Sequence, residues 1–214
     1  SIVERKVGRS EPPQFMFQLL RPPILEMLQD SSGLLEKVVC IVAPVGYGKT
    51  ALMSLLLADL RSKGRQCRWL GLDQRDTSIE DVLGSLVSLI DTRTSEQQPA
   101  QALFQSNRSI ERRIDALIEI ITGYPLPMTL FIDNLNACND SELGLLLDKL
   151  IFSSPPSLQL ILSSTQELPF DLTRALLAGL IRPVGDAELA FGAGEGGLLL
   201  GEKICTHIGS SGLR

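Results

Sequence analysis

Short apolar runs alternate with longer stretches of helical periodicity through most of the chain. Val38–Val42 is a continuous, mostly β-branched run, and the leucines between Thr50 and Leu60 recur at helical spacing. Further strand-type runs are Cys67–Leu72, Met128–Ile132, Leu158–Leu162 and Ile181–Val184, and further helical segments are Thr77–Ile90, Ile110–Ile121, Ser141–Phe152 and Leu172–Leu180. Strands that alternate with helices predict an α/β fold: a mainly parallel sheet of about five strands in a three-layer α/β/α arrangement.

One predicted helix carries a start signal. Thr77 and Glu80 have the Thr-x-x-Glu spacing of a capping box, in which each side chain accepts a hydrogen bond from the backbone of the other residue. We therefore expect a helix to open at this pair and to run through Ile90.

Both ends of the chain and one internal stretch lack the alternation. Residues 1–33 contain two Pro-Pro pairs and predict an extended arm with a short helix, Ile24–Leu28, packed on the core. Asp91–Asn107 is rich in Gln, Ser and Thr and predicts a loop. We expect an arm at 1–33, the α/β core at 34–191, and at 192–214 a Gly-rich connection that starts a following helical region of a larger protein.

Composition and charge narrow the class of protein. Of the 214 residues, 44% are hydrophobic and 21% are charged, which is typical of a globular domain. A net charge of -5 provides no general attraction to nucleic-acid phosphates, so we do not expect this segment to bind DNA directly. No apolar run approaches the roughly 18 residues that span a bilayer. We therefore expect a cytoplasmic protein that does not bind membranes.

The residue types of metal and redox sites are scarce or scattered. The cysteines stand at Cys40, Cys67, Cys138 and Cys205. They form no C-x-x-C pair, which favours free, buried thiols in a reducing cytoplasm. His207 is the only histidine, so histidine-based triads and multi-histidine metal sites are poorly supported. Trp69 is expected in the core.

A phosphate-loop pattern links the first predicted strand to the first predicted helix. Residues 43–50 match G-x-x-x-x-G-K-[ST], the Walker A motif, except that Ala43 replaces the first glycine. In this motif backbone N–H groups face the phosphates, Lys49 neutralises β/γ oxygens and Thr50 ligates Mg²⁺. A chance surface turn would not need a buried strand before it and a helix after it. The candidate nucleotide-binding residues here are Ala43, Gly46, Tyr47, Gly48, Lys49, Thr50 and Ala51.

A second candidate lies about 80 residues downstream, where an acidic residue ends an apolar strand in the manner of the carboxylate that reaches Mg²⁺ in such ATPases. Asp133 follows Phe131-Ile132 in this position. An isolated Asp after a strand is ordinarily a helix cap or turn former, but the phosphate loop favours the metal role. We therefore assign Thr50 and Asp133 as metal ligands, and Lys49 and Asp133 as the catalytic candidates.

Hydrolysis has weaker support in the sequence. Asn134 stands where many such ATPases carry a second acidic residue that polarises the attacking water, and an amide cannot serve as a base near pH 7. Hydrolysis is therefore expected to be slow or to need another group. Ser163-Ser164-Thr165 ends the fourth predicted strand, where the hydroxyls either sense the nucleotide or cap the strand end.

Three segments together carry a family resemblance. They are Leu20-Arg21-Pro22-Pro23-Ile24-Leu25, Ala43-Pro44-Val45-Gly46-Tyr47-Gly48-Lys49-Thr50 and Trp69-Leu70-Gly71-Leu72-Asp73. With them the chain resembles the ATPase domain of MalT-like large LuxR-type transcriptional regulators, members of the STAND class of signal-transducing P-loop NTPases. The resemblance continues through 131–134, 160–164 and 187–191. Ala43 in the first position of the loop is itself typical of that family.

The resemblance implies a nucleotide-dependent switch. Members hold ATP or ADP in a closed, monomeric state; inducer and ATP open them, and they self-associate to activate transcription. By resemblance this chain binds ATP or ADP with Mg²⁺, and Arg21 lies near the base or ribose. DNA would be bound only through a C-terminal helix-turn-helix that is not within these 214 residues.

Three departures from the family keep alternatives open. The family commonly has an acidic residue at Asn134, an arginine at Thr165 and Gly-Trp-Pro-like residues at 212–214. The first two favour a nucleotide-binding scaffold or interaction module without turnover as the second interpretation. A small-molecule kinase is a third, but it would need a cluster of arginines over the transferred phosphate, which the sequence does not present.

Overall fold

Five parallel strands form the centre of the molecule. The computed structural model describes residues 11–12, 28, 36–90, 109–168 and 172–193. The strands are β1 (Val38–Val42), β2 (Gln66–Gly71), β3 (Met128–Asp133), β4 (Leu158–Ser164) and β5 (Ile181–Val184). They lie in the order β2-β3-β4-β1-β5, and every neighbouring pair is parallel. The predicted sheet is confirmed.

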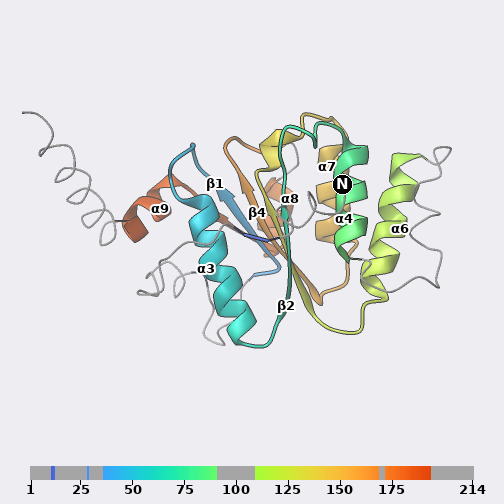
Figure 1. The fold of residues 1–214 in the computed structure, drawn as a ribbon, viewed down its shortest axis with the longest axis horizontal. Helices are drawn as coiled ribbons and strands as arrows, with labels where there is room; N and C mark the ends of the chain where they lie inside the picture. Colours follow the sequence, from blue (N-terminus) through green and yellow to red (C-terminus); the bar gives the residue numbers. More distant parts are fainter. Residues whose placement is uncertain (1–10, 13–27, 29–35, 91–108, 169–171, 194–214) are drawn as a thin grey trace, which may run out of the picture.

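Helices cover both faces of this sheet, as Figure 1 shows. They are α3 (Lys49–Ser62), α4 (Ile79–Ile90), α6 (Ile110–Thr122), α7 (Leu143–Phe152), α8 (Leu172–Leu177) and α9 (Asp186–Ala193), with the 3-10 turn η1 (Leu135–Ala137) after β3. Helix α3 packs on one face, whereas α4, α6 and α7 pack on the other. The domain therefore has three layers, with helices on each side of the sheet.

Each strand contributes side chains to two separate hydrophobic clusters. In β1, Val39 and Ile41 pack with α3, whereas Val38 and Cys40 face the cluster that contains α4, α6 and α7. Every residue of β4 is buried. Strands covered on both faces are mostly apolar at consecutive positions, which is why these segments are largely apolar runs rather than alternating ones.

The sequence-derived assignment of Trp69 to the core is confirmed. Its side chain is 2% exposed and stacks on Phe131 of the neighbouring strand, with ring centroids 5.6 Å apart and an interplanar angle of 21°. Cys40, Cys67 and Cys138 are free and buried, as expected. Cys205 and His207 lie outside the described residues. In the described part of the chain, no helix is long and apolar enough to cross a membrane.

Two helix assignments need correction. The capping pair of α4 is Ser78 and Asp81, not Thr77 and Glu80: Asp81 N–H donates to Ser78 Oγ at 3.3 Å, and that hydroxyl donates to Asp81 Oδ2 at 2.6 Å. The helix starts one residue later than predicted because Ile79 N–H donates to Asp140 Oδ2 at 3.0 Å, a contact from a segment distant in sequence.

Helix α9 was not predicted. Gly185 N–H donates to Glu188 Oε2 at 2.9 Å, which is half of a capping box. The three-residue spacing between Gly185 and Glu188 was the available signal, but the glycines after Phe191 concealed it. The predicted helix Ile24–Leu28, apart from helical Leu28, and the predicted loop Asp91–Asn107 lie outside the described residues.

Candidate functional site

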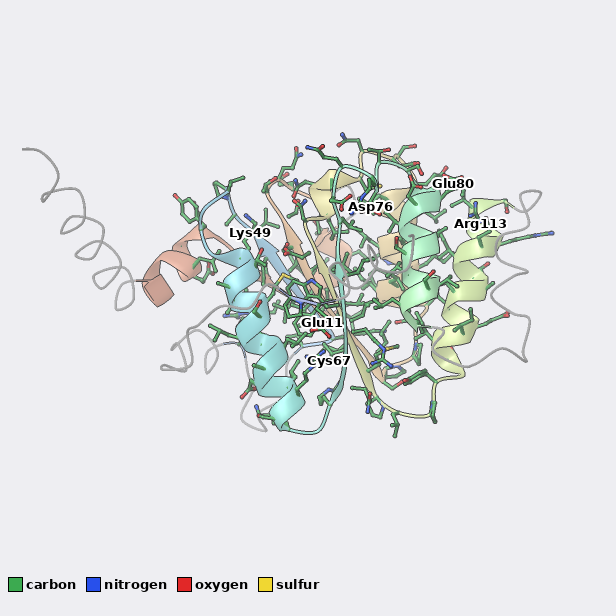
Figure 2. All side chains as sticks on the ribbon, viewed as in Figure 1. Glu11, Lys49, Cys67, Asp76, Glu80 and Arg113 are labelled. Carbon is green, nitrogen blue, oxygen red and sulfur yellow. The ribbon has the colours of Figure 1, made fainter. Side chains whose placement is uncertain are left out.

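The candidate residues meet at the carboxyl edge of the sheet. Because all strands are parallel, the segments that follow β1, β3 and β4 leave the sheet on the same side. The loop after β1 carries Lys49, the end of β3 carries Asp133, and the end of β4 carries Ser163. Figure 2 shows Lys49 and Asp76 toward this edge, and Cys67 nearer the opposite one.

Two glycines shape the loop between β1 and α3. Gly46 has a φ of 90° and Gly48 a φ of 78°, a left-handed region that other residues rarely adopt. No heavy atom lies within 4 Å of a Cβ built on either glycine, so the requirement for glycine comes from the backbone angle and not from lack of space. The predicted role of these glycines in bending the chain agrees with this geometry.

The start of α3 is available to an anion. Gly48 is its N-cap and contributes no side-chain hydrogen bond, and the first turn holds no acidic residue. The first N–H groups of a helix have no intrahelical partners and carry a partial positive charge. This arrangement, together with the exposed loop residues Gly46 and Gly48, is typical of a phosphate-binding helix terminus.

Lys49 lies folded against its own loop. Its side chain is almost buried, and Nζ donates to Ala43 O at 2.6 Å and to Pro44 O at 2.8 Å. Burial lowers the pKa of Lys49 from its ordinary value, and the nearby carboxylate of Asp133 opposes that shift. The two hydrogen bonds hold the ammonium group inside the loop at the carboxyl edge, in the position where it can face a phosphate.

A direct hydrogen bond joins the two predicted metal ligands. Thr50 Oγ1 donates to Asp133 Oδ2 at 2.9 Å, although the two residues are 83 positions apart in the sequence. The other carboxylate oxygen of Asp133, Oδ1, accepts a short hydrogen bond from Ser163 Oγ. Hydroxyl and carboxylate oxygens are the ligands that Mg²⁺ prefers. The predicted pair is therefore adjacent and chemically suited to the ion.

Asn134 occupies a strained conformation beside Asp133. Its φ of 65° makes it the one non-glycine residue with positive φ in the described part of the chain. Its backbone N–H donates to Ser163 Oγ at 2.9 Å, and its side-chain Nδ2 donates to Leu72 O at 3.0 Å. Asparagine tolerates this region better than most residues. The amide therefore holds the end of β2 next to β3.

Ser164 and Thr165, at the same strand end, have partners other than Asp133. Ser164 Oγ accepts from Gln166 N–H at 3.2 Å, and Thr165 N–H donates to Asn136 Oδ1 at 2.9 Å. The Ser164 bond fits the strand-capping interpretation, whereas the Thr165 bond is made by its backbone. Ser163 differs, because its hydroxyl contacts Asp133. The sequence pattern did not separate the three hydroxyls, since their positions relative to β3 depend on strand order.

Buried Asp76 was also missed by the sequence analysis. Its side chain is 1% exposed, and Oδ2 accepts from Asp73 N–H at 2.8 Å. Arg75 makes a short ion pair with the carboxylate of Asp73. These three residues shape the loop after β2, at the same edge of the sheet as Asp133. The loop is also tied to β3, because Leu72 N–H donates to the backbone oxygen of Asp133 at 3.0 Å.

The structure places most of the predicted residues around one loop. Ala43 is buried at the end of β1, Tyr47 is 45% exposed, and Ala51 lies half-buried in the first turn of α3. Arg21 lies outside the described residues. Within the described ranges there is no group of three or more His, Cys, Asp or Glu side chains that could hold a metal. A Mg²⁺ at Thr50 and Asp133 would therefore need further oxygens from phosphates and water.

Most of the chain matches a known protein family. Residues 19–165 match the family described as Nephrocystin 3, N-terminal. The chain belongs to this family. The match takes in the loop at 43–50 and the ends of β3 and β4, where the candidate residues lie.

The chain also matches curated relatives. It is 23% identical over 185 residues to the HTH-type transcriptional regulator MalT of two Klebsiella pneumoniae strains, ATCC 700721 / MGH 78578 and 342. The alignment covers 85% of this chain and 20% of MalT, so the chain spans about a fifth of the length of these relatives. The predicted resemblance to the ATPase domain of MalT-like regulators is confirmed.

A solved structure supports the fold. Cdc6p from Pyrobaculum aerophilum superposes with a TM-score of 0.52 at 13% sequence identity, over 80% of this chain and 47% of that chain. At this sequence identity the similarity supports the fold alone. Together with the parallel five-stranded sheet, it confirms the predicted three-layer α/β/α P-loop NTPase fold.

Proposed function

We propose that this chain is an ATP- or ADP-binding regulatory ATPase domain that uses Mg²⁺. The observation that carries the proposal is the bond between Thr50 and Asp133, because it joins the end of the phosphate-type loop to a carboxylate on a different strand. A turn that merely contained Gly-Lys-Thr would not need such a partner. The kinship with MalT, an HTH-type transcriptional regulator, supports a regulatory role.

In the proposed complex, the phosphates lie against the loop at 43–50. The N–H groups of Gly46, Tyr47, Gly48 and the first turn of α3, including Ala51, donate to phosphate oxygens. Lys49 exchanges its hydrogen bonds to Ala43 O and Pro44 O for the β/γ oxygens. Arg21 is proposed, by family resemblance alone, to lie near the base or ribose.

Thr50 and Asp133 are proposed to hold Mg²⁺, which would neutralise charge on the transferred phosphate when bound. Lys49 and Asp133 are the proposed catalytic residues. With Asn134 in place of a second acid, phosphate release is expected to be slow. A nucleotide shifts the equilibrium between two conformations only through contacts that differ between them, and the γ-phosphate can make such contacts. Slow hydrolysis would remove these contacts and so return the switch to its resting conformation.

The specific alternative is a nucleotide-binding scaffold without turnover. It is favoured by Asn134, whose amide is engaged by Leu72 O and whose type provides no base. In this alternative, ATP or ADP stabilises the domain, and the surface serves partner contacts. Both functions require binding and differ in phosphate release.

At the level of the whole protein, we propose a cytoplasmic MalT-like regulator of the LuxR type. The segments would be an arm at 1–33, the NTPase core at 34–191 and a connection at 192–214 to a helical region. Self-association would accompany activation, and DNA would be bound through a helix-turn-helix elsewhere in the protein.

Calorimetric titration of the purified chain with ATP and with ADP, each with Mg²⁺, tests binding, and phosphate release from the same sample tests turnover. Binding with slow release supports the switch, and binding with no release supports the scaffold. If neither nucleotide binds, the proposed function is wrong.

The variant Lys49→Ala should weaken ATP binding by at least about tenfold, because it removes the cation opposite the phosphates. Its fold should persist, since the lysine bonds only to its own loop. Lys63→Ala, at the other end of α3, is the matched control and should bind ATP like the wild type. Unchanged ATP affinity in Lys49→Ala would contradict the site assignment.

A further inference from the structure

Asp133 is held from two sides. Thr50 Oγ1 donates to Oδ2 from the start of α3, and Ser163 Oγ donates to Oδ1 from β4, the strand between β1 and β3. A carboxylate that receives one hydrogen bond on each oxygen cannot rotate about its terminal torsion without losing both. The sequence predicts Thr50 and Asp133 as metal ligands but gives Ser163 no part in holding Asp133.

The hydroxyl proton of Ser163 has a defined direction. The backbone N–H of Asn134 donates to Ser163 Oγ at 2.9 Å, so that oxygen acts as acceptor on this side. A serine hydroxyl has a single proton, and that proton is left to point at Asp133. The bonds form a directed chain from Asn134 N–H through Ser163 O–H to the carboxylate, and successive bonds of this kind polarise one another.

The Ser163 side chain is shielded from solvent. Ser163 is 0% exposed on β4, the central strand of a sheet covered on both faces, and its neighbour Leu162 is also 0% exposed. The N–H that donates to this hydroxyl belongs to Asn134, the residue directly after Asp133. The Asn134 N–H and the buried hydroxyl thus both serve one oxygen of Asp133, which is more than capping of the strand end requires.

We infer that Ser163, backed by the N–H of Asn134, is a positioning residue for the Mg²⁺ site, which fixes the orientation of Asp133 toward the ion. The inference rests on the proposed function, because it assumes that Asp133 meets Mg²⁺ held with a nucleotide. Ser163 acts through Asp133 and not on the γ-phosphate. It therefore affects the gain in ATP affinity that Mg²⁺ provides, and not the affinity for ATP without metal.

Ser163→Ala tests the inference, and Ser164→Ala is the matched control. The two serines are adjacent, both are at most 1% exposed, and the Ser164 hydroxyl bonds Gln166 N–H and not Asp133. ATP is titrated calorimetrically into wild type and both variants, with MgCl₂ and with EDTA. The ratio of the two dissociation constants gives the Mg²⁺-dependent gain, and thermal melting reports folding of each variant.

We expect Ser163→Ala to lose most of the Mg²⁺-dependent gain, by about fivefold or more, with ATP affinity in EDTA unchanged, and Ser164→Ala to keep both. A full gain in Ser163→Ala overturns the inference while the proposed function stands. If wild type does not bind ATP, both fail. Should Ser163→Ala not fold, Ser163→Cys, a weaker donor of similar size, is titrated instead; a Mg²⁺-dependent gain equal to that of wild type again overturns the inference.

Discussion

Asn134 shows how one residue can join three strands. Its side chain holds Leu72 at the end of β2, its backbone N–H holds Ser163 at the end of β4, and it directly follows Asp133 of β3. A left-handed φ costs most non-glycine residues about 1 kcal/mol or more, and it persists where surrounding bonds enforce it. The amide thus donates a hydrogen bond that ties the ends of two strands together, at a position where the family that this chain resembles commonly has an acidic residue.

Asn134→Asp introduces an acidic residue but should not speed hydrolysis, because the side chain at this position is directed to Leu72 O. A carboxylate cannot donate to Leu72 O and would face that carbonyl oxygen, so we expect the free energy of unfolding to fall by about 1–3 kcal/mol. Phosphate release should stay at or below the wild-type rate. Urea denaturation and a phosphate assay measure the two quantities.

Exposed Asn139→Asp is the control for this experiment, since it adds the same charge on the same segment. If Asn134→Asp were as stable as wild type and released phosphate faster, the structural role of the amide would be wrong.

At the scale of elements, Asp140 links the starts of two helices. Its Oδ2 accepts from Ile79 N–H of α4 at 3.0 Å, and its Oδ1 accepts from Glu142 N–H, just before α7, at 2.9 Å. These backbone hydrogen bonds lower the pKa of Asp140 from its ordinary value of 3.8, and the bond from Glu142 has the larger effect on it. One side chain therefore sets where α4 begins and how it sits beside α7.

Asp140→Ala should lower the free energy of unfolding by about 1–2 kcal/mol at neutral pH, the usual effect of removing a helix cap. Because the folded-state pKa is lowered, the contribution of Asp140 is present above pH 3.8 and is lost as the pH falls through the lowered value. The deficit of the variant should therefore shrink in acid.

Urea denaturation of wild type and Asp140→Ala across this pH series measures the difference, with exposed Asn139→Ala as the control. A deficit that stays constant down to strong acid would show that the effect does not come from the carboxylate.

At the scale of the whole molecule, two hydrophobic clusters on one sheet bury the thiols. Cys40 belongs to the cluster under α4, α6 and α7, and Cys67 to the cluster under α3. Burial raises the pKa of the Cys40 thiol to about 12, and burial is also the largest cause of the raised pKa values of Cys67 and Cys138. Thiolates, the reactive form, are therefore scarce on both faces at neutral pH.

In a Cys205→Ser chain, which removes the one cysteine outside the described residues, a thiol reagent should label no cysteine in native buffer within minutes. All three remaining thiols should react in concentrated denaturant. Absorbance of the released chromophore counts them, with the unfolded chain as the positive control. Fast labelling of any thiol in native buffer would contradict the packing of the cluster to which it belongs.

The pattern of residues predicted the elements but not all of their limits. The strand Val38–Val42 agrees with β1 to the residue, because a buried strand after a turn has a distinct local signal. The start of α4 was missed by one residue, since Asp140, 61 positions away from Ile79, selects it. The conformation of Asn134 gave no sequence signal, because asparagine is equally common in ordinary turns.

The sequence by itself determined the α/β alternation, the loop with Gly46, Gly48 and Lys49, and an acidic strand end at Asp133. These features depend on periodicity and on local backbone conformation, which neighbouring residues specify. Only the tertiary structure decided the order β2-β3-β4-β1-β5 and the bonds among Thr50, Asp133 and Ser163. The same apolar runs fit several strand orders, and contacts across 83 or 30 positions follow from packing of the whole sheet.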